Sequence, residues 1–257
     1  MQLIDTHSHL YSDKFDSDRS DVVRNAIKNG VSTILLPNIS SKYTASMLDL
    51  CSRFPANCFP MMGVHPCDVN EENYKCEIEH VEKELITKKY IAVGEIGIDL
   101  YWDKSTIEIQ KQAFIHQIEL AKKYNLPIVI HVRNAFDETI KIVEKYNSNK
   151  LRGVFHCFTG SINEANRVLE LQDFFLGIGG VLTFKNSGLD KTIKEVELNK
   201  ILLETDSPYL APTPFRGKRN ESKYLLNIAE KLAVIHNITI EEVAHITTKN
   251  AKILFRL

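Results

Sequence analysis

Six side chains of the types that bind divalent metals follow short apolar runs of the chain. They are His7, His9, Glu95, His131, His156 and Asp206. The first two lie in Asp5-Thr6-His7-Ser8-His9, and because strand side chains alternate, both imidazoles are expected on the same side. Paired imidazoles suit an ion such as Zn²⁺ or Mn²⁺. Alone, this motif is equally consistent with a polar turn that carries two ordinary histidines.

The other four residues close apolar runs further along the chain. His131 follows Val129-Ile130, His156 follows Val154-Phe155, Asp206 closes 202–206 and Glu95 closes 92–95. Singly, a histidine there can be a satisfied core residue, and an acid there can be the N-cap of the next helix. Chance placement of all six at strand ends of one barrel is improbable, so together they predict a metal centre.

The order of these residues favours two divalent ions. A carboxylate midway along the series, Glu95, can bridge ions roughly 3.5–4 Å apart, as in two-metal sites. Asp206, the last ligand, can hold a water and take its proton, since a divalent ion lowers the pKa of a bound water from ~15.7 to ~7. Asp206 and Glu95 are therefore the predicted catalytic residues. Imidazole and carboxylate ligands accept Mg²⁺, Mn²⁺ or Zn²⁺.

The elements that must position these residues follow a repeating pattern. Short apolar runs, typical of strands buried on both faces, occur at 2–4, 31–36, 58–62, 91–93, 127–130, 153–155, 174–178 and 201–203. Helical patterns separate them, and capping-box spacing predicts helix starts at Ser105, Ser161 and Thr239, each with Glu three residues later. Two further helices are expected after Asn220.

Eight strands alternating with helices predict an α/β fold, either a barrel or a doubly wound sheet. The sequence contains neither a GxGxxG nor a P-loop motif, the two motifs that would indicate a nucleotide-binding sheet. Closure at eight strands favours a (β/α)8 TIM barrel with additional C-terminal helices. The length of 257 residues suits one such domain over 1–257.

Composition limits the partners and the compartment. A formal net charge of −1 argues against a long nucleic-acid footprint, so any polynucleotide is held locally near the active site. Five cysteines without a CxxC pair argue against a disulfide framework and predict a reducing cytoplasm. No run approaches the ~18 apolar residues of a membrane span, and no signal peptide is visible.

Seven blocks, in order along the whole chain, resemble the TatD family of metal-dependent deoxyribonucleases, within the amidohydrolase-like barrels. The blocks are DTHSHL at 5–10, GVHP at 63–66, GEIGID at 94–99, PIVIHVR at 127–133, HCFTG at 156–160, ETDSPYL at 204–210 and RGKRN at 216–220. The chain departs from the usual pattern at Leu100, Asn134 and Ser222, which bears on substrate contacts and not on the metals.

The resemblance implies a ligand set and a reaction. One metal is expected among His7, His9, Glu95 and Asp206, and the other among Glu95, His131 and His156. The implied reaction is phosphodiester hydrolysis, typically of DNA and often from the 3′ end, with single-stranded DNA as the expected partner and RNA as a further substrate.

Substrate contacts are expected around the metals. His65 can donate to a phosphate oxygen, and Arg133 offers a fork of donors for phosphate. The basic cluster Arg216, Lys218 and Arg219 predicts contact with the backbone of a nucleic acid, although such a run is usually a solvated face.

Two other features have alternative interpretations. Asp99 can orient a ligand histidine or cap its loop. Tyr101 and Trp102 can stack bases or cover the barrel end.

Two rival functions remain open on sequence. A related binuclear barrel hydrolase would cleave a C–N or aminoacyl-ester bond, and many of these bridge their metals with a carbamylated lysine at the fourth strand. Here that position is Glu95 and Lys104 lies well into the loop, which favours the nuclease. A catalytically idle binding scaffold would lack a ligand, and none is missing.

Overall fold

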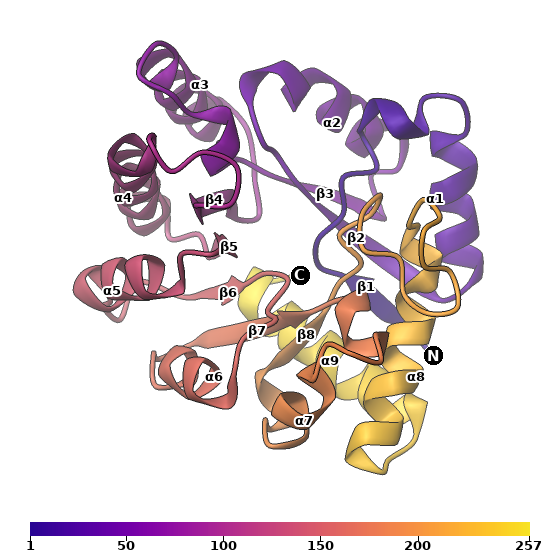
Figure 1. Ribbon diagram of the computed structural model, residues 1–257. Coiled ribbons are helices and arrows are strands. Elements are labelled where there is room, and N and C mark those ends of the chain that lie inside the picture. The colour runs from indigo at the N-terminus through magenta and orange to yellow at the C-terminus, as the bar shows by residue number, and fades with distance from the viewer.

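The computed structural model describes residues 1–257 and shows a ring of eight parallel strands with helices outside it (Figure 1). The strands are β1 (Leu3–Asp5), β2 (Val31–Pro37), β3 (Cys58–Met61), β4 (Val93–Asp99), β5 (Ile128–Arg133), β6 (Gly153–Phe155), β7 (Phe174–Ile178) and β8 (Ile201–Leu203). They form two hydrogen-bonded groups, β1-β2-β3 and β4 to β8 in sequence order.

The two groups of strands are joined into a closed barrel by short contacts. A parallel bridge between Met62 and Val93 joins β3 to β4, and another between Ser8 and Ser207 joins β1 to β8. The amide of Thr6 also donates to Leu203 O at 3.0 Å. The predicted (β/α)8 barrel is therefore confirmed. Because the strands are parallel, their C-terminal ends all lie at the same end of the barrel, which we call its mouth.

Each strand is followed by a helix, and one helix is added at the C-terminal end. The helices are α1 (Arg19–Lys28), α2 (Ser41–Arg53), α3 (Tyr74–Thr87), α4 (Ile107–Tyr124), α5 (Phe136–Tyr146), α6 (Ile162–Leu169), α7 (Leu189–Lys194), α8 (Leu225–His236) and α9 (Ile240–Phe255). Short 3-10 helices lie at η1 (Asp13–Phe15), η2 (Pro66–Asp68), η3 (Gly180–Thr183), η4 (Leu198–Lys200) and η5 (Ser222–Tyr224). The two helices expected after Asn220 are α8 and α9.

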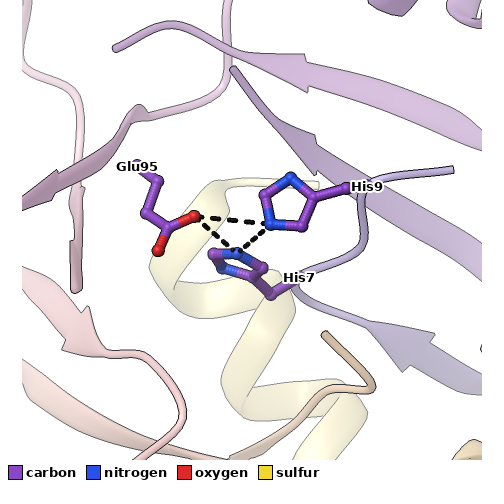
Figure 2. A group of neighbouring side chains, drawn as sticks. All are labelled: His7, His9 and Glu95. Carbon is purple, nitrogen blue, oxygen red and sulfur yellow. Dashed lines mark hydrogen bonds and ion pairs between the residues drawn. The ribbon is translucent and has the colours of Figure 1, made fainter. Parts of the chain in front are cut away.

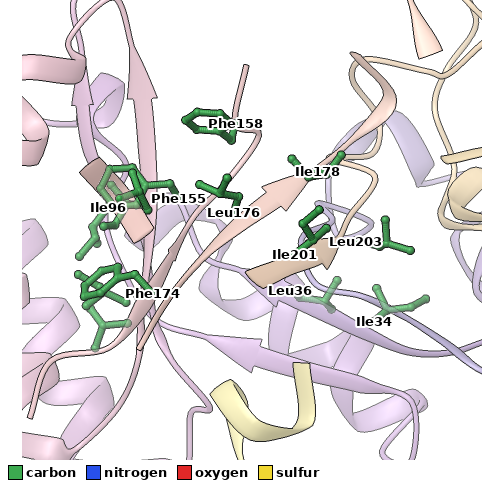
Figure 3. Packing of buried hydrophobic residues seen from close by; sticks show 14 of the residues in the cluster. Ile34, Leu36, Ile96, Phe155, Phe158, Phe174, Leu176, Ile178, Ile201 and Leu203 are labelled. Carbon is green, nitrogen blue, oxygen red and sulfur yellow. The ribbon is translucent and has the colours of Figure 1, made fainter. Parts of the chain in front are cut away.

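Alternate strand residues build two apolar layers, which explains why the strands read as continuous apolar runs. On β7, Phe174, Leu176 and Ile178 join the large outer layer between strands and helices (Figure 3), whereas Phe175 joins the inner one. Each strand contributes one residue to the inner layer, and for β4 this residue is the one directly before the strand. The eight residues are Ile4, Leu35, Met61, Ala92, Val129, Val154, Phe175 and Leu202. The barrel interior is therefore packed below its mouth.

Helix α9 closes the end of the barrel opposite the mouth. Its residues Ala251, Leu254 and Phe255 are buried against the inner layer. The neighbouring Ile253 faces away and is 60% exposed. The additional helix therefore completes the core that the strands begin.

Three details of the local predictions need correction. The strand expected at 91–93 begins at Val93 and continues to Asp99, so Glu95 lies inside β4 and does not end it. The strand expected at 127–130 continues to Arg133, so His131 lies inside β5. Glycine and charged residues in 94–99 hid this extension. The predicted cap at Ser105 is also wrong, because Ser105 bonds Asp103 Oδ1 and α4 starts after Thr106. Capping boxes at Ser161 and Thr239 are confirmed.

No helix combines the length and apolar character that a membrane crossing requires. All five cysteines are free thiols. The cytoplasmic location that their pattern predicts stays a prediction.

Leu254→Ala should destabilise the protein by about 2–5 kcal/mol, because it opens a cavity between α9 and the barrel interior. Ile253→Ala on the same turn should change the free energy of unfolding by no more than about 0.5 kcal/mol. Urea denaturation followed by circular dichroism measures both. Equal effects of the two substitutions would show that α9 does not seal the barrel as described.

Candidate metal centre

The inner layer of the barrel places the ligand residues above it at the mouth. His131 lies two residues beyond Val129, and His156 lies two residues beyond Val154, so both imidazoles continue the inward face of their strands. On β4 the register shifts between Val93 and Ile96. Because Ile96 and Ile98 join the outer layer, the alternation puts Glu95 on the inward face.

One group of ligand atoms forms around Oε2 of Glu95 (Figure 2). His7 Nε2 lies 3.1 Å from this oxygen and 3.2 Å from His9 Nε2. His9 Nε2 lies 3.4 Å from Glu95 Oε2 and 3.5 Å from Asp206 Oδ1. Asp206 has a φ of +57°, a conformation that Asp tolerates better than most residues.

A second group forms around the other oxygen of the same carboxylate. Oε1 of Glu95 lies 2.9 Å from His131 Nδ1 and 3.4 Å from His156 Nε2. The imidazoles of His7 and His156 stack at 3.5 Å between centroids, so the two groups are adjacent. All six predicted ligands meet at one mouth, with Glu95 between the two groups, although their roles as ligands stay a prediction.

The spacing of these atoms fits coordination of a divalent ion. A metal with bonds of about 2.0–2.2 Å to nitrogen and oxygen holds neighbouring ligand atoms roughly 2.8–3.6 Å apart. The distances from each oxygen of Glu95 to its imidazoles, and those from His9 Nε2 to His7 Nε2 and Asp206 Oδ1, lie in this range, whereas His7 Nε2 and Asp206 Oδ1 are 3.9 Å apart. The facing Nε2 atoms of His7 and His9 can form a hydrogen bond only if one of them carries a proton, whereas a shared cation binds the lone pairs of both.

In three imidazoles, one ring nitrogen is hydrogen-bonded to a neighbouring side chain, so that the other nitrogen faces Glu95. They belong to His9, His131 and His156. The hydroxyl of Tyr11 donates to Pro37 O, so its oxygen accepts from His9 Nδ1 at 2.9 Å. In the neutral ring the lone pair of His9 is then on Nε2, which faces Glu95. The contribution of Tyr11 was not predicted from sequence.

Two acidic residues orient the histidines of the second group. Asp99 Oδ2 accepts from His131 Nε2 at 2.9 Å, as one of its two sequence interpretations expected. Glu204 Oε1 lies 2.9 Å from His156 Nδ1, a contact that sequence reasoning missed. Glu204 fits because residue 177 on β7 is glycine: a Cβ there would lie 2.4 Å from Glu204 Oε2.

His65 also approaches the centre, with Nε2 3.4 Å from Glu95 Oε1. The backbone N–H of Cys67 donates to His65 Nδ1 at 3.1 Å, so in the neutral ring the proton is on Nε2. A protonated Nε2 donates hydrogen bonds and does not bind a metal. The tautomer is consistent with the predicted role of His65 as a donor to substrate.

The charges of the centre are strongly coupled. Burial would raise the pKa of Glu95, but His7, His65 and His156 hold it well below its usual range. Burial likewise opposes protonation of His156, but the carboxylates of Glu204 and Glu95 raise its pKa to about 9. The carboxylate of Glu95 is therefore ionised at neutral pH, and metal ions compete with protons for the imidazoles.

The predicted substrate-binding residues lie at different places around the mouth. Arg133 is exposed at the end of β5 and stacks on Tyr101. Arg216 stacks on Phe184, and Lys218 is exposed in the loop after β8.

The guanidinium of Arg219 already has partners inside the protein. It lies 2.6 Å from Asp18 and 3.2 Å from Glu221, over the ring of Phe15. These contacts leave few donors for phosphate.

Comparisons with known proteins match the chain from end to end. A family model described as TatD related DNase matches residues 4–256. The chain is 37% identical to the metal-dependent hydrolase YabD of Bacillus subtilis over 256 residues, which is 99% of each chain. It is 33% identical to the metal-dependent hydrolase YcfH of Escherichia coli over 261 residues, covering 100% of this chain and 97% of that one.

Solved structures give the same result. The crystal structure of YjjV, a TatD homologue from Escherichia coli, has a TM-score of 0.92 at 28% identity and covers 99% of this chain and 98% of its own. A TatD family hydrolase from Entamoeba histolytica has a TM-score of 0.86 at 22% identity, covering 99% and 98%, and supports the fold alone.

Glu204→Gln should lower metal affinity by about 10–100-fold, because a neutral amide orients and polarises His156 less well than a carboxylate does. Competition with a chelator, followed by metal analysis, measures this. Glu197→Gln removes an exposed carboxylate after α7 and should leave metal affinity unchanged. Unchanged affinity in Glu204→Gln would mean that Glu204 does not support a ligand.

Proposed function

The chain belongs to the TatD family of metal-dependent hydrolases, and from this premise we propose that it cleaves phosphodiester bonds of DNA with two divalent ions. One observation carries the proposal: the two oxygens of Glu95 face two separate groups of histidines. Two ions held by this carboxylate and the histidines would stabilise the attacking and leaving oxygens of a phosphodiester. Hydrolysis from the 3′ end, and of RNA, is part of the same proposal.

His7, His9, Glu95 and Asp206 would hold one ion, and Glu95, His131 and His156 the other. When bound, such ions neutralise charge on the phosphate and lower the pKa of water. The donor set does not select between Mg²⁺, Mn²⁺ and Zn²⁺.

The chain itself supplies the proton acceptor and the phosphate donors. Burial would raise the pKa of Asp206, but its bond to His9 and the nearby His156 lower it, so the carboxylate is ionised and able to accept a proton. His65 Nε2–H donates to a phosphate oxygen from beside Glu95. Arg133, Arg216 and Lys218 contact the phosphates of a single strand, which is a local grip consistent with the net charge of −1.

Metal-depleted protein incubated with labelled single-stranded DNA, RNA and an aminoacyl ester, with each metal added back, tests the proposal. Cleavage of DNA that returns only with added metal is the expected result. Shortening by one nucleotide at a time from a 5′-labelled strand would indicate 3′ to 5′ polarity. Hydrolysis of the ester with intact DNA would instead support the related class of hydrolases that act on C–N or ester bonds.

Asp206→Asn should reduce kcat by about 10²–10⁴-fold, because the amide keeps an oxygen ligand but cannot accept the proton. Metal content and KM should change little. Glu95→Gln should instead lose metal, since a neutral amide bridges two cations poorly. Metal analysis and single-turnover rates on both variants decide between the roles. Loss of metal from Asp206→Asn with retention in Glu95→Gln would reverse the assignment.

A further inference from the structure

Two aromatic side chains are exposed beside the metal centre, in the loop between β4 and α4. Tyr101 is 51% exposed and Trp102 is 72% exposed, and their rings meet edge to face at 4.8 Å. Rings exposed to this extent bury little apolar surface, which favours the interpretation as a stacking surface over that of hydrophobic cover. Exposed rings next to an active site are typical of binding surfaces.

Arg133 completes this surface, which we call the aromatic platform (Tyr101, Trp102 and Arg133). Its guanidinium carbon lies 3.6 Å from the ring centroid of Tyr101 and 5.5 Å from that of Trp102. Stacking of this kind holds the guanidinium plane in place while its N–H groups stay directed outward along the edge. Arg133 forms no ion pair with a protein carboxylate, so these donors can serve an anion.

Asp99 fixes the aromatic platform relative to the metal centre. Its Oδ1 accepts from the amide of Tyr101 at 2.8 Å, and its Oδ2 accepts from His131 Nε2 at 2.9 Å. Gln110 bonds both backbone groups of Asp99, at 2.9 and 3.0 Å. One carboxylate therefore positions a candidate metal ligand and the loop with the exposed rings.

We propose that the aromatic platform stacks an unpaired nucleobase of the nucleotide beside the scissile phosphate, while Arg133 contacts a phosphate of the same strand. This inference rests on the proposed nuclease function and names the part of the substrate that is recognised. Stacking needs an open base face, and inside a duplex both faces are covered by neighbouring bases. The platform therefore selects frayed or single-stranded ends, with little preference among the bases, since each base has a π-face.

Trp102 is the only tryptophan in the chain, so its fluorescence reports on the platform directly. Metal-loaded protein is titrated with a short phosphorothioate-linked oligothymidylate, which resists cleavage, and with an abasic oligomer of the same length and linkage. Binding of both is measured independently by anisotropy of a terminal dye. The thymidylate should quench Trp102 emission and shield it from acrylamide, whereas the abasic strand should do neither.

Kinetics give a second, independent readout. Trp102→Ala should raise KM for oligothymidylate about 5- to 150-fold with kcat nearly unchanged, which is the range expected for one lost stacking contact. These rates are measured on cleavable oligomers with ordinary phosphodiester linkages, and on the abasic one this difference should shrink to about twofold or less. Val234→Ala removes an apolar side chain that is 75% exposed on α8, far along the chain from the site, and serves as the matched control.

The outcomes separate this inference from the function on which it rests. Cleavage of both oligomers with equal kcat/KM, without quenching, would overturn the aromatic platform and leave the nuclease intact. Failure to bind or cleave any oligonucleotide would overturn both. Quenching by a protein partner but by no oligonucleotide would reassign the exposed rings to a protein interface.

Discussion

The structure depends on one buried carboxylate. Glu95 is 2% exposed, and an ionised carboxylate removed from water is unfavourable by several kcal/mol unless cations or hydrogen-bond donors compensate it. Five imidazoles from the ends of four different strands approach its two oxygens: His7, His9, His65, His131 and His156. Closing the barrel brings these loops together, so the fold and the charge at its mouth are mutually dependent. In the absence of metal, protons on His9, His131 and His156, whose pKa values are raised despite burial by the surrounding carboxylates and hydrogen bonds, provide compensating charge. Divalent ions would take over that role when they bind.

Part of this arrangement could be predicted because it follows from local sequence. The last three strands have the bounds that their apolar runs indicate, and the ligands after them follow from strand direction in a parallel barrel. The fourth strand was predicted too short, because Gly94, Glu95 and Gly97 interrupt its apolar pattern. Its inward face is also set by a register shift against β5, which depends on the neighbouring strand and has no signature in a single sequence.

The residues that orient the ligands were harder to predict for the same reason. Tyr11 follows His9 by two positions and Glu204 precedes Asp206 by two, but both pairs lie in the loops after β1 and β8, where strand alternation does not fix which way a side chain points. Spacing alone could not say which histidine Glu204 contacts, since it reaches across from β8 past a glycine on β7 to His156. The basic cluster of the sequence divides in the structure into two exposed cations, Arg216 and Lys218, and one arginine, Arg219, that is paired with Asp18, a long-range contact without a local sequence signal.

Three non-glycine residues at the same mouth have left-handed backbone conformations. Asn134, Cys157 and Asp206 have positive φ angles of 54°, 47° and 57°, and each lies at the point where the chain leaves β5, β6 or β8. Such conformations typically cost about 1–3 kcal/mol each and persist only where the surroundings over-determine them. Cys157 and Asp206 turn the chain immediately after or at a predicted ligand, so that the ligand side chain stays inside the barrel while the backbone moves outward. Asn134 turns the chain at the end of β5, and Asn tolerates this backbone conformation. The apolar inner layer and α9 supply the stability that offsets this strain, which separates the end of the barrel that holds the fold from the end that carries the chemistry.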